Sequence, residues 1–167
     1  PLRLARGAYD SPVLSPDGRQ IALVVRDTTG AHVWVYDIAR RTLGKRTFDG
    51  SNDTFPVWSR DGTSLIFTRN PTESLMRVRA DGSGPAEPLV TAAQLPGSKV
   101  ATSWSPDDRL LAIQNGPDVV VRDTEGVFHP TLTTGASERE ARFAPAGQWL
   151  AYRSTETGRD EVYVQSY

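Results

Sequence analysis

The sequence has no cysteine, no long apolar run and almost no net charge, and each absence excludes a class of protein. Without cysteine, its 167 residues cannot hold a disulfide scaffold or a cysteine-rich zinc site, while compartments inside and outside the cytosol both stay open. No apolar run approaches the roughly 20 residues that a membrane-spanning helix needs, so we expect no direct membrane insertion. A net charge of −1 provides no basic face for nucleic acid.

Sequence signatures of catalysis are missing too. There is no Gly-x-Ser-x-Gly nucleophile elbow. The only histidines, His32 and His129, stand far apart and lack a His-Glu-x-x-His spacing, so we expect surface or turn residues rather than metal ligands. The sequence therefore predicts no catalytic residue, no metal and no cofactor. The chain begins with Pro1 and has no signal peptide, which predicts a processed chain or a piece of a longer one.

The sequence does contain one four-residue motif, which occurs four times. Its fourth positions, 18, 62, 108 and 147, are 44, 46 and 39 residues apart. A period of about 40–45 residues is typical of β-propeller blades. The copies are Ser15-Pro16-Asp17-Gly18, Ser59-Arg60-Asp61-Gly62, Ser105-Pro106-Asp107-Asp108 and Ala144-Pro145-Ala146-Gly147.

Short apolar runs surround each copy, and no segment of useful length has helical periodicity. A run follows each turn: Ile21-Ala22-Leu23, Leu65-Ile66-Phe67, Leu111-Ala112-Ile113 and Leu150-Ala151-Tyr152. Such runs between turn residues indicate buried strands. A further strand follows in each unit, and a less distinct one closes it, in the first unit at Arg46-Thr47-Phe48. We predict an all-β propeller of four-stranded antiparallel blades.

Turn chemistry explains the repeated carboxylates. Proline presets φ at the second turn position, aspartate at the third accepts hydrogen bonds from nearby amides, and glycine tolerates positive φ at the fourth. We therefore interpret these residues as structural turns, with Asp108 and its tolerance of positive φ in place of glycine. The turn residues are Asp17, Gly18, Asp61, Gly62, Asp107, Asp108 and Gly147.

The two ends of the chain are out of phase with the repeat. Residues 6–48, 49–91, 92–134 and 135–167 form the repeats, and an additional strand at 1–5 could complete the last blade, hiding its sheet edge. Three arrangements stay open: a piece of a larger propeller, a four-bladed ring closed within one chain, or a homodimer that completes a larger ring. The mass in solution separates the dimer from the other two.

Charged residues recur near the start of each repeat and form a candidate binding face. In propellers, the loops before the first strands line one face near the central channel, where a mixed set of charges could bind a peptide or a cation. Tyr9, Phe55 and Trp149 are candidate exposed aromatic contacts, whereas Trp58 and Trp104 are predicted to pack between blades. The charged candidates are Asp10, Asp53, Lys99, Arg139 and Glu140.

The stretch Val57–Phe67, which reads apolar-Trp-Ser-x-Asp-Gly followed by a Leu-Ile-Phe strand, resembles the WD40-like repeat of TolB-type propellers. The resemblance extends over essentially the whole chain, and the closing stretch Asp160–Tyr167 is most similar to propellers linked to bacterial serine/threonine kinases. The family's repeats also form the gating propellers of prolyl-oligopeptidase-like and dipeptidyl-peptidase-like enzymes. The resemblance implies a periplasmic or other extracytoplasmic location.

Three functions are compatible with the sequence. The first is a non-catalytic module that binds a protein or peptide or senses a ligand, as part of a larger bacterial protein. The second is a propeller that gates substrate for a peptidase domain outside this sequence. The third is a hydrolase or lyase that gathers carboxylates at the channel mouth. We favour the first, since no nucleophile or base is in evidence.

Overall fold

The computed structural model describes residues 8–49 and 52–167, which fold as antiparallel strands joined by turns. The all-β fold of propeller blades is as predicted. Within these two ranges no helix is long and apolar enough to cross a membrane. The predicted strand at residues 1–5 lies outside the described residues.

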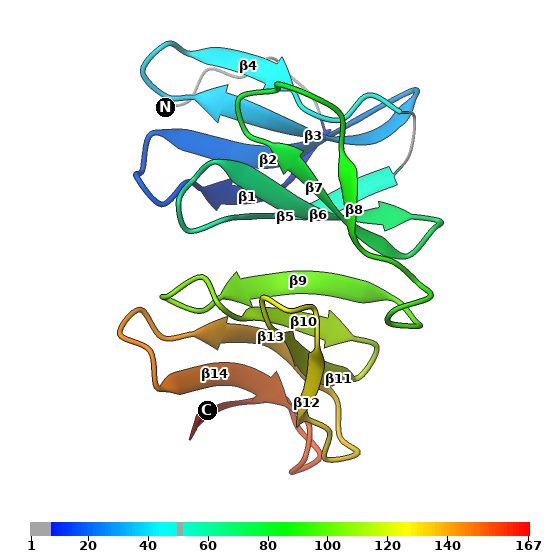
Figure 1. The fold of residues 1–167 in the computed structure, drawn as a ribbon, viewed down its shortest axis with the longest axis vertical. Coiled ribbons are helices and arrows are strands. Elements are labelled where there is room, and N and C mark those ends of the chain that lie inside the picture. The colour runs from blue at the N-terminus through cyan, green and yellow to red at the C-terminus, as the bar shows by residue number, and fades with distance from the viewer. Residues whose placement is uncertain (1–7, 50–51) are drawn as a thin grey trace. The chain divides into compact units, whose positions relative to one another are not determined.

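The strands form four sheets, one for each repeat, and neighbouring strands in a sheet follow one another along the chain (Figure 1). Blade 1 contains β1 (Ala8–Leu14), β2 (Gln20–Asp27), β3 (Gly30–Asp37) and β4 (Thr42–Lys45). Blade 2 contains β5 (Asn52–Trp58), β6 (Ser64–Asn70), β7 (Ser74–Arg79) and β8 (Glu87–Val90).

Blade 3 has the same meander as the first two blades, and blade 4 has three strands within the described residues. Blade 3 contains β9 (Lys99–Trp104), β10 (Leu111–Asn115), β11 (Asp118–Arg122) and β12 (Phe128–Leu132). Blade 4 contains β13 (Glu138–Phe143), β14 (Trp149–Ser154) and β15 (Glu161–Ser166). The chain divides into two compact units, with blades 1 and 2 before Pro96 and blades 3 and 4 after Gly97.

Each unit has its hydrophobic core between its two blades. In the first unit, Val33 and Val35 of blade 1 pack with Phe67 and Trp58 of blade 2. Trp58 is 5% exposed, and its Nε1–H donates a hydrogen bond to the carbonyl of Val13 at 3.0 Å, joining the first strands of the two blades. Trp58 therefore packs between blades, as predicted, because an indole combines a large apolar surface with one polar atom that needs a partner.

The second unit repeats this arrangement with different residues. Val121 of blade 3 shares a core with Phe143, Leu150 and Tyr152 of blade 4. Its polar link between first strands comes from Ser103, whose Oγ accepts a hydrogen bond from the Phe143 backbone N–H at 3.1 Å. Trp104, also predicted to pack between blades, is half-buried.

The repeated motif forms the turn between the first and second strand of each blade. In blade 2, the Ser59 hydroxyl donates to Asp61 Oδ1 at 2.6 Å and accepts from the Ser64 backbone N–H at 3.0 Å. The same pair of hydrogen bonds occurs at Ser15 and at Ser105. At the fourth turn position, Gly18, Gly62, Asp108 and Gly147 all have positive φ, between 59° and 76°. These bonds and φ values are those of a tight turn, and they give the serine and aspartate side chains a part in its local structure.

The fourth turn keeps the backbone geometry without the side-chain bonds. Gly147 N–H donates to the Ala144 carbonyl at 2.9 Å, as Gly18 N–H does to Ser15. Because Ala144 and Ala146 have no side-chain acceptor, the turn depends on its backbone bonds and on positive φ at both Gly147 (76°) and Gln148 (68°).

The last strand of blade 1 differs from the prediction. We expected it at Arg46-Thr47-Phe48, but β4 ends at Lys45. Beyond that point the bonding to β3 continues in a different form, since Arg46 N–H donates to the Val33 carbonyl at 2.8 Å and the Thr47 hydroxyl accepts from Val33 N–H at 3.1 Å. A side chain replaces a backbone group in this bond, so the regular ladder stops.

The three Ser–Asp turns predict an acid-sensitive contribution to stability. The serine hydroxyl bonds hold the pKa of Asp17, Asp61 and Asp107 below the ordinary value of 3.8. A carboxylate with a lowered folded-state pKa stabilises the fold above the unfolded pKa, and this contribution is lost as the pH falls through the folded value.

We therefore expect the free energy of unfolding to fall as the pH drops from about 5 to about 2, partly through these three groups. The triple variant Asp17→Asn, Asp61→Asn, Asp107→Asn keeps a side-chain acceptor in each turn but cannot titrate. Urea unfolding at a series of pH values should show a shallower decline for the variant. An unchanged decline would assign the acid sensitivity to other groups.

Candidate binding surface

The first strand of every blade has an irregularity in its pairing with the second strand. In β1 the register shifts between Asp10 and Val13, and in β5 between Thr54 and Val57. In β13 it shifts between Arg139 and Arg142, and β9 shows a corresponding shift before Ser103. A bulge of this kind bends a strand and changes the direction of a side chain, and bulges are common beside functional sites.

Three of these bulges contain a residue other than glycine with positive φ. Ser11 has φ of 49°, Phe55 of 53° and Glu140 of 55°. Such conformations cost free energy for a residue with a Cβ and are concentrated where the chain presents a functional group. In blades 1 and 2 a proline follows the bulge residue, which is compatible with a backbone nitrogen that the ladder does not use. We call the side of each blade that carries these residues its bulge end.

The aromatic candidates are exposed, as expected. Tyr9 is 36% exposed, Phe55 is 49% exposed and Trp149 is 51% exposed. Phe55 lies in the bulge of β5 and Tyr9 lies just before the bulge of β1, on first strands that belong to neighbouring blades of one unit. Trp149 starts β14 beside the turn at Gly147, so it lies at the opposite end of blade 4 from the bulge.

The five charged candidates lie inside the first strands, whereas the sequence placed them in the loops before those strands. They occupy three different register positions. Asp10 and Arg139 are the last paired residues before the bulge, and Glu140 is itself in the bulge. Asp53 and Lys99 lie at an earlier position that pairs with Arg69 and Asn115.

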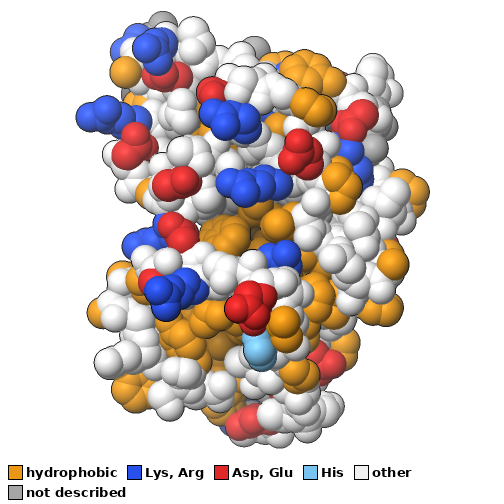
Figure 2. Space-filling view, in the orientation of Figure 1, with side chains coloured by type: hydrophobic (Ala, Val, Ile, Leu, Met, Phe, Trp, Pro, Cys, Tyr) orange, Lys and Arg blue, Asp and Glu red, His pale blue; other side chains and the backbone are white. Residues whose placement is uncertain are grey.

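Asp10, Arg139 and Glu140 are exposed and make polar contacts within their own units. Asp10 pairs with Arg26 at 3.3 Å, and the hydrogen bond from Arg26 holds the pKa of Asp10 below its usual value. Glu140 pairs at 3.3 Å with Arg153, which also contacts Asp160 at 2.9 Å. Arg139 Nε–H donates to the Ser137 hydroxyl at 2.7 Å. Side chains of both signs are interspersed on the face shown in Figure 2.

Asp53 belongs to a buried ion cluster. Its side chain is fully buried and accepts two hydrogen bonds from Arg69, at Oδ1 (2.8 Å) and Oδ2 (3.0 Å). The same guanidinium also donates to both carboxylate oxygens of Asp49. The hydrogen bond that Arg69 donates to Asp53 raises the pKa of Arg69, so this arginine is charged at every physiological pH. Sequence reasoning missed this cluster, although the spacing of Asp53 and Arg69 on consecutive strands could have indicated a cross-strand pair.

The corresponding positions of the second unit also hold buried charges. Lys99 is fully buried, and its Nζ donates to the Gly97 carbonyl at 2.6 Å. Glu138 occupies the same register position in blade 4, is fully buried, and accepts a hydrogen bond from the Thr134 hydroxyl. Glu138 was not among the candidates. Its position before the bulge is visible only once the strand register is known.

The histidines were expected as surface or turn residues, and for His32 this is wrong. His32 is fully buried in β3, where its Nε2 lies 3.0 Å from the Thr29 hydroxyl. His129 is exposed and lies 2.7 Å from Asp123, which lowers the pKa of that aspartate. Within 8–49 and 52–167 no group of three or more histidine, aspartate or glutamate side chains could hold a metal ion.

Because Arg69 is buried, we expect its ion pair with Asp53 to contribute more to the free energy of unfolding than the half-exposed ion pair of Arg26 with Asp10. Arg69→Met should lower the free energy of unfolding by about 3–5 kcal/mol, because it leaves Asp53 charged and buried without a partner. Arg26→Met removes the half-exposed pair with Asp10 and should cost less than about 1 kcal/mol. Urea unfolding of both variants measures the difference, and an equal loss in the two would contradict the role of burial.

Both the sequence and the structure of the chain are similar to those of known proteins. The model of the TolB beta propeller domain family matches residues 3–167. The structure is similar to TolB from Acinetobacter baumannii, with a TM-score of 0.82 and 21% identity over 99% of this chain and 42% of that one.

Enzymes share the fold too. For the tricorn protease the TM-score is 0.72, with 17% identity over 99% of this chain and 18% of that one. For oligogalacturonate lyase from Vibrio parahaemolyticus it is 0.67, with 13% identity over 95% and 48%. The chain thus spans less than half of the length of each of these three proteins. Because the family model matches nearly every residue, the chain belongs to the TolB beta propeller domain family.

Proposed function

We propose that the chain is a non-catalytic module that binds a protein or peptide through the bulge ends of its first strands. One observation carries the proposal: Phe55 is held in a strained bulge conformation and exposed to solvent, on the strand that the buried Asp53 joins to β6 through Arg69. A rigid exposed aromatic ring loses little entropy when a partner covers it, and aromatic residues dominate the energetics of protein interfaces.

The surroundings of Phe55 support protein recognition. Tyr9 lies on the adjacent first strand, and the half-exposed pair of Asp10 and Arg26 borders it on β1 and β2. An apolar centre with a charged rim is typical of interfaces between proteins. Asp53, beneath this surface, holds β5 to β6 through Arg69 and does not itself reach solvent. In blade 4, Arg139 and Glu140 offer exposed charges at the bulge end.

A second candidate is a propeller that gates substrate for a hydrolase domain elsewhere in a larger protein. The fold likeness to the tricorn protease is compatible with it, since this chain covers 18% of that protein. The full reading frame separates the two: a domain with a Gly-x-Ser-x-Gly motif favours gating, whereas a kinase domain with one membrane helix favours sensing. The similarity to kinase-linked propellers and the extracytoplasmic location stay predictions.

The test uses peptides selected from a random displayed library on the folded protein. We expect Phe55→Ala and Tyr9→Ala each to weaken binding of a selected peptide about tenfold or more, measured by calorimetry. Leu14→Ala is the matched control. Leu14 is an apolar residue at the opposite end of β1 that is more exposed (57%) than either aromatic residue, and its substitution should leave binding unchanged.

Two results would contradict the proposal. One is an equal loss of binding in Leu14→Ala and Phe55→Ala, since it would show that the peptide recognises general hydrophobic exposure. The other is a library that yields no peptide whose binding depends on either aromatic residue.

A further inference from the structure

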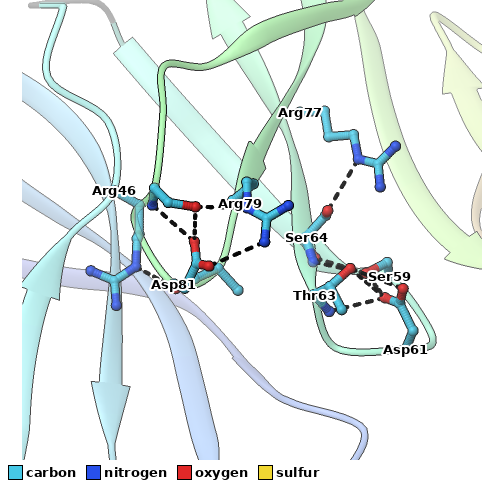
Figure 3. Close-up of polar contacts among 10 residues, drawn as sticks. Arg46, Ser59, Asp61, Thr63, Ser64, Arg77, Arg79 and Asp81 are labelled. Atoms are coloured by element: carbon cyan, nitrogen blue, oxygen red, sulfur yellow. Dashed lines mark hydrogen bonds and ion pairs between the residues drawn. The ribbon is translucent and has the colours of Figure 1, made fainter.

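A polar cavity in blade 2 lies at the end of the blade away from Phe55. It has a volume of about 370 Å³ and is lined by β7, by the start of β6 and by the loop that leads into β8. Ligand cavities start at about 300 Å³, so it can accept a group of a few heavy atoms. Figure 3 shows the polar side chains of this region, with Arg77 and Arg79 on β7 and Ser64 on β6.

Arg77 is the unusual residue of this cavity. In β7 it pairs with Ile66, and the residues at the same register position of the other blades are Val35, Val121 and Val164. Val35 and Val121 are buried in the cores of their units. Blade 2 therefore has an exposed guanidinium where the repeat otherwise has valine. Packing within the repeat does not require this charge.

Arg77 does not form the ion pair that its position favours. Glu87 on β8 is its direct cross-strand partner, and opposite charges at such positions attract. No ion pair joins the two within the described residues. Arg77 Nε–H instead donates to the hydroxyl of Ser64, a buried residue on the other neighbouring strand, at 3.1 Å. Arg77 and Glu87 thus line one cavity without an ion pair between them.

The second arginine of the cavity is fixed by a turn. Arg79 Nε–H donates to the Ser83 hydroxyl at 2.7 Å and Nη2–H to Asp81 at 3.2 Å (Figure 3). Hydrogen bonds from Ser83 hold the pKa of Asp81 well below its usual range. Asp81 therefore offsets the charge of Arg79. Arg77 and Glu87 remain without an ion pair between them, and Arg77 is also attracted by Asp61 of the neighbouring turn.

We propose that this cavity binds a zwitterionic group of the amino-acid class, one with a carboxylate and a cation close together. The guanidinium of Arg77 matches a carboxylate with two parallel hydrogen bonds, and Glu87 accepts from the cation. A dianionic phosphate fits less well, because Glu87 repels it. A free amino acid and an acidic residue beside a basic one in a peptide share this chemistry.

The experiment follows amide and Arg77 Nε–H resonances by NMR during titration of the whole chain. L-alanine represents the free amino acid and N-acetyl-Glu-Lys-amide the peptide, whereas acetate and inorganic phosphate each lack the cation. We expect saturable shifts at Ser64, Arg77 and Ser83 with alanine or with the peptide, and the tighter of the two identifies the source. Acetate and phosphate should bind several-fold more weakly.

Two variants test the assigned residues. Arg77→Val introduces the residue of the other three blades, so we expect an unchanged or higher Tm together with an affinity about tenfold lower. Glu87→Gln should weaken binding of the zwitterion but not of acetate. The proposal is overturned if Arg77→Val keeps its affinity, if Glu87→Gln weakens both ligands equally, or if phosphate or acetate binds as tightly as the zwitterions. Because Glu87 is exposed, its variant gives a result even if Arg77→Val fails to fold.

Discussion

A propeller blade cannot bury its own sheet faces, and this constraint shapes most of the chain. Both hydrophobic cores lie between blades: one joins blade 1 to blade 2, and the other joins blade 3 to blade 4. The second strands accordingly carry consecutive buried apolar residues, since both faces of a blade are covered. Two hydrogen bonds join first strands of neighbouring blades, from Trp58 to Val13 and from Phe143 to Ser103. They fix the relative position of the strands, which hydrophobic packing alone does not specify because it is nondirectional.

The same constraint makes the ends of the blades available for function. Because packing uses the faces, the bulge ends and the turn ends carry exposed side chains that a partner can reach. Asp53, Lys99 and Glu138 share one register position before the bulge, and all three are fully buried charges. In blade 2 the residue at this position is Asp53, which joins β5 to β6 through Arg69, and β5 also carries the exposed Phe55.

Sequence reasoning was most successful where local chemistry decides the structure. The turns around Gly62 and Asp108 were predictable, since serine, aspartate and positive φ act within a few residues. It was least successful for side chains whose environment depends on register. A one-residue difference separates Asp10, exposed at the edge of a bulge, from Asp53, buried against Arg69. His32 was wrongly expected at the surface for the same reason. It lies near the start of a strand in the sequence, but its position in β3 is buried.

The sequence by itself determined the repeat, the turn type and the all-β class, because the period and the turn residues act locally and repeat four times. Tertiary structure alone decided which charges are buried and which are exposed. It placed Arg69 between Asp49 and Asp53, turned Arg77 toward Ser64 instead of Glu87, and exposed Phe55 in a bulge. The physical reason is that burial and pairing depend on strand register and on neighbouring strands, which a local pattern does not specify.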